Sequence, residues 1–506
     1  MGMSGLAVEE EPDDETVDDP RRWLKVVSAL EQPRLIYNVA KKHFESDLTG
    51  TITLDVSQAV AIPDDSAWFT PGMIVLIDGV YEEEEESVGK GLSGSSGVGG
   101  TIGGRFQGFF IGQPPCEKRR ATLGVSGPDG GQDHTIGGGF GWIDFLGVGS
   151  ERACGSRMRK LEHRLLRQPS SPDIPGRGRM VILGELNLDQ PRTLQAIKKI
   201  LSTYAMEPEG STPMSFVFTG NFTQHAVMAR GGSGGSVEYK EYFDSLAAIL
   251  AEFPTLLTTA TFTFVPGDND GWVSSFSAGA AVPLPRKSVP DLFTSRIRRT
   301  FASANSEAGT SAGQGGEAVF TSNPSRISLF GPSHEIVVFR DDISARLRRS
   351  AVRLKSTARP QEDENEENRP PTIEDDVAMS GAIPDNGEAD DMEIDRPEKK
   401  PTAISEVPYD VQASRKLVKT LLDQGYLAPF RQSIRPVHWD YASALHLYPL
   451  PTSMVLVDTT APPFCLTYEG CHVMNPGSVL ITGRKSVGRW IEYEIGRVGR
   501  VRECVF

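Results

Sequence analysis

The chain has 506 residues, a formal net charge of −15 and 38% hydrophobic residues, enough for two to four domains with separate cores. It contains no run of 18 or more apolar residues, which excludes a transmembrane helix, so no membrane contact is expected. The five cysteines form no C-x-x-C pair. This excludes a zinc ribbon, makes a disulfide framework unexpected and favours a reducing cytosolic or nuclear compartment.

The negative charge is concentrated in a few stretches. Residues 1–20 contain eight acidic residues and no basic one, and residues 361–400 contain 15 acidic and four basic residues. Such segments cannot bury enough apolar surface to offset the entropy of ordering. We therefore expect an acidic, mostly disordered N-terminus over residues 1–32. The folded parts should be mildly basic, which permits contact with nucleic acid without requiring it.

Residues 33–150 have the pattern of a small β-domain. Short apolar or alternating segments predict strands over 50–56, 72–79 and 106–111. Gly-rich insertions separate them over 82–104 and follow over 128–139. Short strands with long Gly-rich connections favour an OB-fold barrel, and a small β-sandwich is the alternative that the pattern leaves open.

A connecting helix and linker are predicted over residues 151–178, and from residue 179 strands alternate with helices. The predicted strands cover 180–184, 215–220, 261–267 and 335–340, and the predicted helices cover 191–204, 238–252, 289–301 and 343–354. This alternation predicts a largely parallel sheet with both faces covered, in a domain over 179–506.

An acidic, Pro-rich segment over residues 359–408 interrupts this domain and is expected to be disordered. After it, the sequence predicts a helix over 411–426, a shorter one near Tyr441 and a strand over 453–458. Three further segments, 478–482, 490–495 and 501–506, are predicted to close the domain as an antiparallel set.

Polar side chains follow several of the predicted strands. Because ligands of open α/β sheets bind at the carboxyl ends of strands, these residues form the candidate site. They are Glu185, Asn187, Asn221, Asp268, Asn269 and Asp458. Ordinary turn chemistry is the alternative explanation, since Gly, Asn and Asp are common where a strand turns into a helix.

The order of these loops resembles the calcineurin-like metallophosphoesterases, whose Asp, Asn and His ligands hold two metals. Glu185 and Asn187 stand where that family has Asp and His, and Asn221 stands where it has the bridging Asp. Asn269 replaces a histidine, and no G-H-x-H motif occurs anywhere in the chain. The resemblance therefore implies this fold, a β-sandwich with flanking helices, without its metal ligands. No catalytic residue, metal or cofactor is expected.

A narrower resemblance comes from longer blocks of sequence. Residues 216–222, 264–270, 321–327, 335–342 and 471–478 resemble the B subunits of eukaryotic replicative DNA polymerases, and the GDND block at 267–270 favours the epsilon group. The resemblance extends from about Leu35 to the end of the chain. A small helical domain usually precedes the OB-fold in this group, and the sequence shows only an acidic stretch at that place. Either the N-terminus is truncated or this form lacks the domain, which leaves open any contact with the replicative helicase.

The resemblance implies α/β and all-β parts, an OB-fold barrel followed by the inactive phosphoesterase-like domain. It also implies a nuclear, non-catalytic accessory subunit of the DNA polymerase epsilon complex. Such a subunit scaffolds the catalytic subunit's C-terminal zinc-binding region, contacts the other subunits of the complex and meets DNA through the complex during replication.

Two other functions are compatible with parts of the sequence. An active metal-dependent phosphoesterase or nuclease would need a full ligand set, which the missing G-H-x-H motif argues against. A stand-alone single-stranded DNA-binding OB-fold would need aromatic side chains for base stacking between basic residues. Phe106, Phe109 and Phe110 are available, but we expect them in the core, and residues 50–112 contain few Lys and Arg.

Overall fold

The computed structural model describes residues 51–83, 101–119, 156–166, 176–355 and 408–506, and two short strands at 35–38 and 43–46. Within the longer ranges, residues 209, 227–234, 271–278, 311–312, 314, 331–333, 482 and 484–485 are not described. The predictions for 1–32, 84–100, 128–139 and 359–407 lie outside the described residues. None of the helices described is long and apolar enough to cross a membrane.

The first described part is a β-domain built around one long strand. This strand, β6 (Thr101–Gly112), pairs antiparallel with β5 (Leu76–Glu83) and parallel with β3 (Thr51–Asp55) and β4 (Val60–Ala61). Its small core contains Ala59, Ala61, Ala67, Phe69 and Ile111. Two further strands, β1 (Leu35–Asn38) and β2 (His43–Ser46), pair with each other.

One prediction for the β-domain is wrong. Phe109 and Phe110 do not lie in the core, since their side chains are 40% and 45% exposed. The register shift between Asp78 and Gly79 of the neighbouring strand breaks the alternation of faces, so two consecutive phenylalanines reach the surface.

The second part is an α/β domain with two sheets, where the sequence pattern predicted one. The six-stranded sheet has the order β10-β9-β8-β7-β16-β17, and its first four strands are parallel. Its strands are β10 (Ala318–Phe320), β9 (Thr261–Val265), β8 (Ser215–Thr219), β7 (Arg179–Leu183), β16 (Val487–Glu494) and β17 (Arg500–Val505).

The five-stranded sheet has the order β11-β12-β13-β15-β14, with β12, β13 and β15 parallel. Its strands are β11 (Ser325–Leu329), β12 (His334–Arg340), β13 (Ser453–Val457), β15 (Cys471–Asn475) and β14 (Phe464–Tyr468). Among the described residues of the segment 478–482, the predicted strand does not form, and Leu480 makes an isolated bridge to Gly488.

The two sheets pack face to face, so each sheet has helices on only one face. Side chains from both sheets, such as Ile182, Val217, Val338 and Val455, fill the core between them. A strand buried on both faces has the same apolar pattern whether a helix or a second sheet covers it. That is why the sequence pattern alone predicted helices on both faces.

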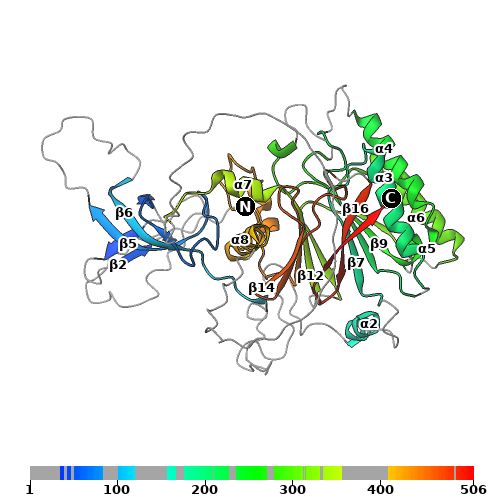
Figure 1. Ribbon diagram of the computed structural model, residues 1–506, viewed down its shortest axis with the longest axis horizontal. Helices are drawn as coiled ribbons and strands as arrows, with labels where there is room; N and C mark the ends of the chain where they lie inside the picture. The colour runs from blue at the N-terminus through cyan, green and yellow to red at the C-terminus, as the bar shows by residue number, and fades with distance from the viewer. Residues whose placement is uncertain are drawn as a thin grey trace, which may run out of the picture.

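Helices cover the outer faces (Figure 1). The six-stranded sheet packs against α3 (Pro191–Ala205), α4 (Ser236–Leu250), α5 (Pro254–Thr259) and α6 (Asp291–Glu307), and the five-stranded sheet packs against α7 (Ile343–Ser350) and α8 (Tyr409–Gln424). A 3-10 helix, η6 (Trp439–Leu445), occupies the region where a short helix was predicted. The connecting helix α2 (Ser156–Leu166) contacts β12 through Glu162 and His334.

The β-domain packs directly on the outer layer of the five-stranded sheet, as Figure 1 shows beside α7 and α8. Trp68 and Met73 join the core that those helices form, and Thr70 Oγ1 donates a hydrogen bond to the Pro429 carbonyl at 3.0 Å. Helix α7 ends at Ser350, earlier than predicted, because the chain then runs extended along the β-domain. There the Val352 amide donates to the Phe69 carbonyl at 2.8 Å.

Candidate functional site

The polar residues that follow the strands converge where the parallel strands of both sheets end. Strands β7, β8 and β9 lead into Glu185, Asn221 and Asn269, and the structure brings these three together. The Asn221 amide nitrogen Nδ2 donates to Glu185 Oε1 at 3.1 Å. The Asn269 backbone amide in turn donates to Asn221 Oδ1 at 2.9 Å. The amide of Asn221 thus links a carboxylate on one side to a backbone donor on the other.

Two glycines allow these loops to approach so closely. A Cβ atom on Gly220 would lie 2.0 Å from Asp270 Oδ2, and one on Gly267 would lie 2.2 Å from Asn221 Oδ1. Neither position has room for a larger residue without moving the loop. The glycines directly before Asn221 and Asp268 therefore have a steric reason.

The centre of this region is occupied by an arginine. Arg340, at the end of β12, is only 2% exposed, and its Nε donates to Glu185 Oε2 at 2.6 Å. A second pair joins Arg340 to Asp342 at 3.1 Å. Burial alone would lower the pKa of Arg340, but Glu185 and Asp342 raise it. Burial raises the pKa of Asp342, but Arg340 and two hydrogen bonds from Thr459 together outweigh this effect and lower it. The guanidinium is therefore a fixed positive charge.

Two further arginines, Arg435 and Arg346, bind the remaining carboxylates at the strand ends. Arg435, which has no exposed surface, donates to Asp268 Oδ1 at 2.5 Å. Arg346 of α7 pairs with Asp341 at 3.0 Å and lies 3.6 Å from Asp268. We call Glu185, Asn221, Asp268, Asn269, Asp341 and Asp342, with Arg340, Arg346 and Arg435, the strand-end cluster. Its carboxylates and guanidinium groups compensate one another.

Asp270 belongs to the packing beneath the cluster. Its carboxylate accepts hydrogen bonds from the backbone amides of Phe222 and Gly267 and from the Tyr239 hydroxyl, all between 2.9 and 3.1 Å. Arg286 donates to its backbone carbonyl. Burial raises the pKa of Asp270 to about 6 in spite of these donors. The residue ties the ends of β8 and β9 together.

Two of the predicted residues lie apart from the cluster. Asp458, after β13, accepts hydrogen bonds from the backbone amides of Ser344 and Thr460 at 2.7 and 2.8 Å. Asn187 lines a polar cleft of about 560 Å³ beside Glu185. Within the described part of the chain, neither side chain hydrogen-bonds to the other four predicted residues.

The sequence analysis missed the arginines. Arg340 stands inside one of the blocks that carried the family resemblance, directly before Asp341 and Asp342, and this run of charge after a buried strand was an available signal. Arg435 had no such signal, because its partner Asp268 is 167 residues away in the chain. Two histidines of the α/β domain contact residues outside the cluster, since His446 packs against the Tyr426 ring and His472 hydrogen-bonds to Thr467.

Comparison with known proteins matches both parts of the chain. The family described as the B subunit of DNA polymerase alpha/epsilon matches residues 180–466, and the family of DNA polymerase epsilon subunit 2-like OB-fold domains matches residues 34–115. The β-domain is therefore an OB-fold domain, followed by a mixed α/β domain with several sheets.

The relatives have consistent names. The chain is 34% identical over 485 residues to the DNA polymerase epsilon B subunit of Saccharomyces cerevisiae, covering 93% of this chain and 59% of that protein. It is 30% identical over 438 residues to the Schizosaccharomyces pombe B subunit, covering 86% and 55%, and 26% identical over 439 residues to subunit 2 of Mus musculus, covering 86% and 58%. The chain thus spans a little over half the length of these relatives. Since the first family model covers more than half of the chain, the chain belongs to the family of DNA polymerase alpha/epsilon B subunits.

Proposed function

We propose that this chain is a non-catalytic accessory subunit of the DNA polymerase epsilon complex. It acts in the nucleus during DNA replication, and it holds the C-terminal zinc-binding region of the catalytic subunit. Contacts with the other subunits and with DNA then come through the assembled complex. Support comes from the family and from relatives named as the B subunit or as subunit 2 of this polymerase. The direct packing of the OB-fold domain on the α/β domain also supports a rigid two-domain scaffold.

The observation that carries the non-catalytic part is the presence of arginines among the strand-end carboxylates. A two-metal centre needs oxygen and nitrogen ligands open to two cations about 3.5–4 Å apart. Here Glu185 and Asp342 bind Arg340, and Asp268 binds Arg435. Among the described residues, no group of three or more His, Cys, Asp or Glu could hold a metal ion. The residues present do not fit a metal centre, and we derive no hydrolytic step from them.

The fold is, in this proposal, a calcineurin-like phosphoesterase fold that has lost its ligands. Two sheets packed face to face between helical layers support it. The proposed domains are an N-terminal segment over 1–32, the OB-fold domain over 33–150 and a connector over 151–178. The phosphoesterase-like domain follows over 179–506, with an insertion over 359–408.

A stand-alone single-stranded DNA-binding role is not favoured. The exposed Phe109 and Phe110 could stack on bases, but Asp78 lies directly across the strand pair from Phe110 and is exposed. Its carboxylate would repel the phosphates of a bound strand.

Co-expression tests the proposed assembly. The chain and the C-terminal region of the catalytic subunit should purify as a stable complex, and the chain alone should be poorly soluble or self-associating. Interfaces of such obligate complexes typically bury more than about 2,000 Å² and are rich in apolar side chains. A monodisperse monomer that fails to bind this region in a pull-down would contradict the proposal.

Deletion of residues 361–400 tests the proposed insertion. The variant should melt at nearly the same temperature as the full chain and should still form the complex, because the segment lies outside the proposed cores. A variant that fails to fold would show that the domain map is wrong.

A further inference from the structure

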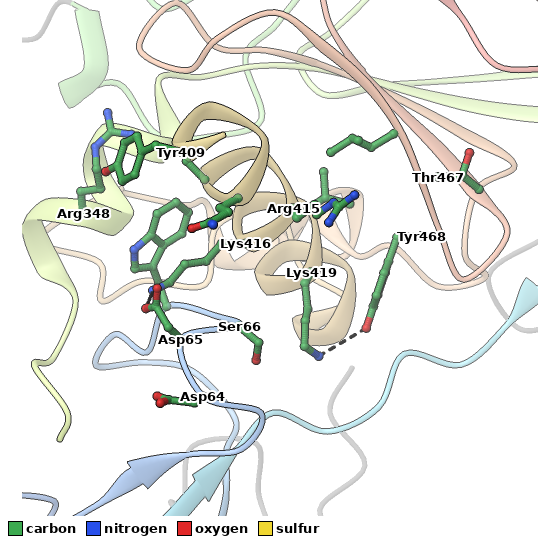
Figure 2. Close-up of a pocket in the computed structure, with 15 residues that line it drawn as sticks. Asp64, Asp65, Ser66, Arg348, Tyr409, Arg415, Lys416, Lys419, Thr467 and Tyr468 are labelled. Carbon is green, nitrogen blue, oxygen red and sulfur yellow. Dashed lines mark hydrogen bonds and ion pairs between the residues drawn. The ribbon is translucent and has the colours of Figure 1, made fainter. Parts of the chain in front are cut away.

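A groove of about 780 Å³ lies where the OB-fold domain meets α7 and α8, and we call it the junction groove. Its walls come from the loop 64–68 of the OB-fold domain, the end of α7, the N-terminal part of α8 and strand β14 (Figure 2). None of its lining residues belongs to the strand-end cluster. It is therefore a separate feature of the surface, built from segments far apart in the sequence.

Two lysines of α8 line the groove, and acidic neighbours neutralise both. Lys416 pairs with Asp65 of the OB-fold domain, and Lys419 pairs with Asp423 one turn further along α8. These lysines fix the walls of the groove and leave little charge for a ligand.

Two arginines of the groove differ from the lysines in having no acidic partner among the described residues. Arg348 of α7 donates to the backbone carbonyl of Thr460 at 3.1 Å, a neutral acceptor, and Arg415 of α8 is exposed. No acidic side chain in the described parts of the chain pairs with either guanidinium. Each guanidinium has five donor hydrogens and prefers carboxylate or phosphate oxygens. The α7–α8 wall therefore presents positive charge that no acidic side chain of the described residues compensates.

The hollow between these walls is apolar and aromatic. Trp68 and Tyr468 form part of the lining, with the ammonium of Lys416 5.4 Å from the Trp68 ring and that of Lys419 5.7 Å from the Tyr468 ring. Tyr409, at the start of α8, is 77% exposed. Figure 2 shows Arg348 and Tyr409 at one end of the groove and Tyr468 at the other. An apolar side chain of a ligand could be buried against this lining.

We propose that the junction groove binds an acidic peptide segment of a partner protein. One bulky apolar side chain of the peptide enters the hollow, and its carboxylates pair with Arg348 and Arg415. Charge complementarity with Arg348 and Arg415 favours an acidic ligand, and the apolar lining of the hollow favours a peptide side chain over a continuous phosphate backbone. The volume lies in the range of pockets that bury a compact ligand. This proposal does not depend on which complex the chain joins.

The test uses a short fluorescein-labelled peptide in which Asp and Glu flank a central Phe-Leu pair, with fluorescence anisotropy as the readout. Two matched peptides replace the acidic residues with Lys or the Phe-Leu pair with Gly-Gly. The full chain should bind the acidic apolar peptide, more weakly at higher salt, and should bind neither matched peptide. Failure of the full chain to bind the acidic apolar peptide would overturn the proposal, as would equal binding of all three peptides.

Charge reversal locates the binding site. The double variant Arg348→Glu/Arg415→Glu should weaken binding by about tenfold or more, because two favourable pairs become repulsive. The matched control is Arg296→Glu/Arg299→Glu, which reverses two arginines of α6 on the opposite side of the molecule and should bind as the unchanged chain does. Equal weakening in both variants would contradict the groove as the site.

Two further experiments distinguish the proposed peptide from other ligands that could occupy the groove. Labelled oligothymidylate should bind the full chain no better than it binds the double variant. If it binds better and displaces the peptide, the groove is a nucleic-acid site and the proposal is wrong. If the peptide binds only after residues 361–400 are deleted, the occupant is a segment of this chain and not a partner protein.

Discussion

The strand-end cluster and the junction groove both combine arginines with carboxylates, but they use them differently. In the cluster, Arg340 and Arg435 are buried and each pairs with a carboxylate of another strand end. In the groove, Arg348 and Arg415 have no carboxylate partner among the described residues. A buried charge is tolerated only when it is paired, whereas an exposed charge remains available to bind a ligand. The comparison indicates that the cluster holds the fold and the groove is available for binding.

The largest expected effect comes from removing the central charge of the cluster. Arg340→Ala leaves the carboxylates of Glu185 and Asp342 without their buried partner, so the free energy of unfolding should fall by about 3–5 kcal/mol. Urea denaturation measures this loss. The control Arg299→Ala, on the exposed side of α6, should stay within about 0.5 kcal/mol of the unchanged chain. Similar losses in both variants would show that the cluster does not hold the fold.

A second prediction concerns the close approach of the cluster loops. Gly220→Ala places a Cβ atom 2.0 Å from Asp270 Oδ2 and 2.5 Å from the Gly267 nitrogen, so the loops must move apart. The expected loss is about 3 kcal/mol. Gly235→Ala is the matched control, since nothing lies within 4 Å of its new Cβ, and it should cost less than about 1 kcal/mol. Equal thermal stability of the two variants would contradict this packing.

The buried carboxyl of Asp270 predicts a pH dependence. Its pKa in the folded chain is about 6, above the value of about 3.9 in an unfolded chain, so the folded state holds the proton more strongly. Its contribution to stability is therefore complete below about pH 4 and is lost as the pH rises to about 6, by about 3 kcal/mol at most. Urea denaturation at several pH values measures this loss. Asp270→Asn should remove it.

Asp342→Asn is the opposite control. Because Arg340 lowers the pKa of Asp342, that residue contributes stability that is present above about pH 4 and lost as the pH falls. The pH profiles of the two variants should therefore deviate from that of the unchanged chain in opposite directions. Parallel profiles for all three proteins would contradict the assigned environments.

The smallest expected effect belongs to the groove. Lys416→Ala removes the pair with Asp65, whose side chain is 80% exposed, and the contact with the Trp68 ring. Exposed pairs and contacts of this kind contribute at most about 1 kcal/mol each. The melting temperature should therefore change little. A loss as large as that of Arg340→Ala would mean that the groove is part of the structural core.

The sequence was sufficient to predict the long buried strands and most of the helices. Strands β7, β8 and β13 contain continuous apolar runs, which are typical of strands buried on both faces, and β9 alternates threonine with phenylalanine. Strands β10, β11, β14 and β15 were missed, because three to five residues of mixed polarity give no clear period. The division into two sheets is a tertiary property that no local pattern contains.

The candidate site was also only partly predictable from the sequence. Glu185, Asn221 and Asn269 follow parallel strands, so their meeting at one edge could be expected from topology, and they do meet. Their ionic partners could not be predicted in the same way. Arg340 is 155 residues from Glu185 in the chain, and no periodicity connects them. Asp458 also follows a parallel strand, but it belongs to the second sheet and binds α7 instead.

Metal content tests the central claim most directly. The purified chain, incubated with Mn²⁺ and Zn²⁺ and then freed of unbound metal, should contain far less than one metal ion per molecule by mass spectrometry. The reason is that guanidinium groups already pair with Glu185, Asp268 and Asp342. It should also hydrolyse no phosphodiester in the presence of Mn²⁺. Stoichiometric metal together with hydrolysis that Asn221→Ala abolishes would contradict the account.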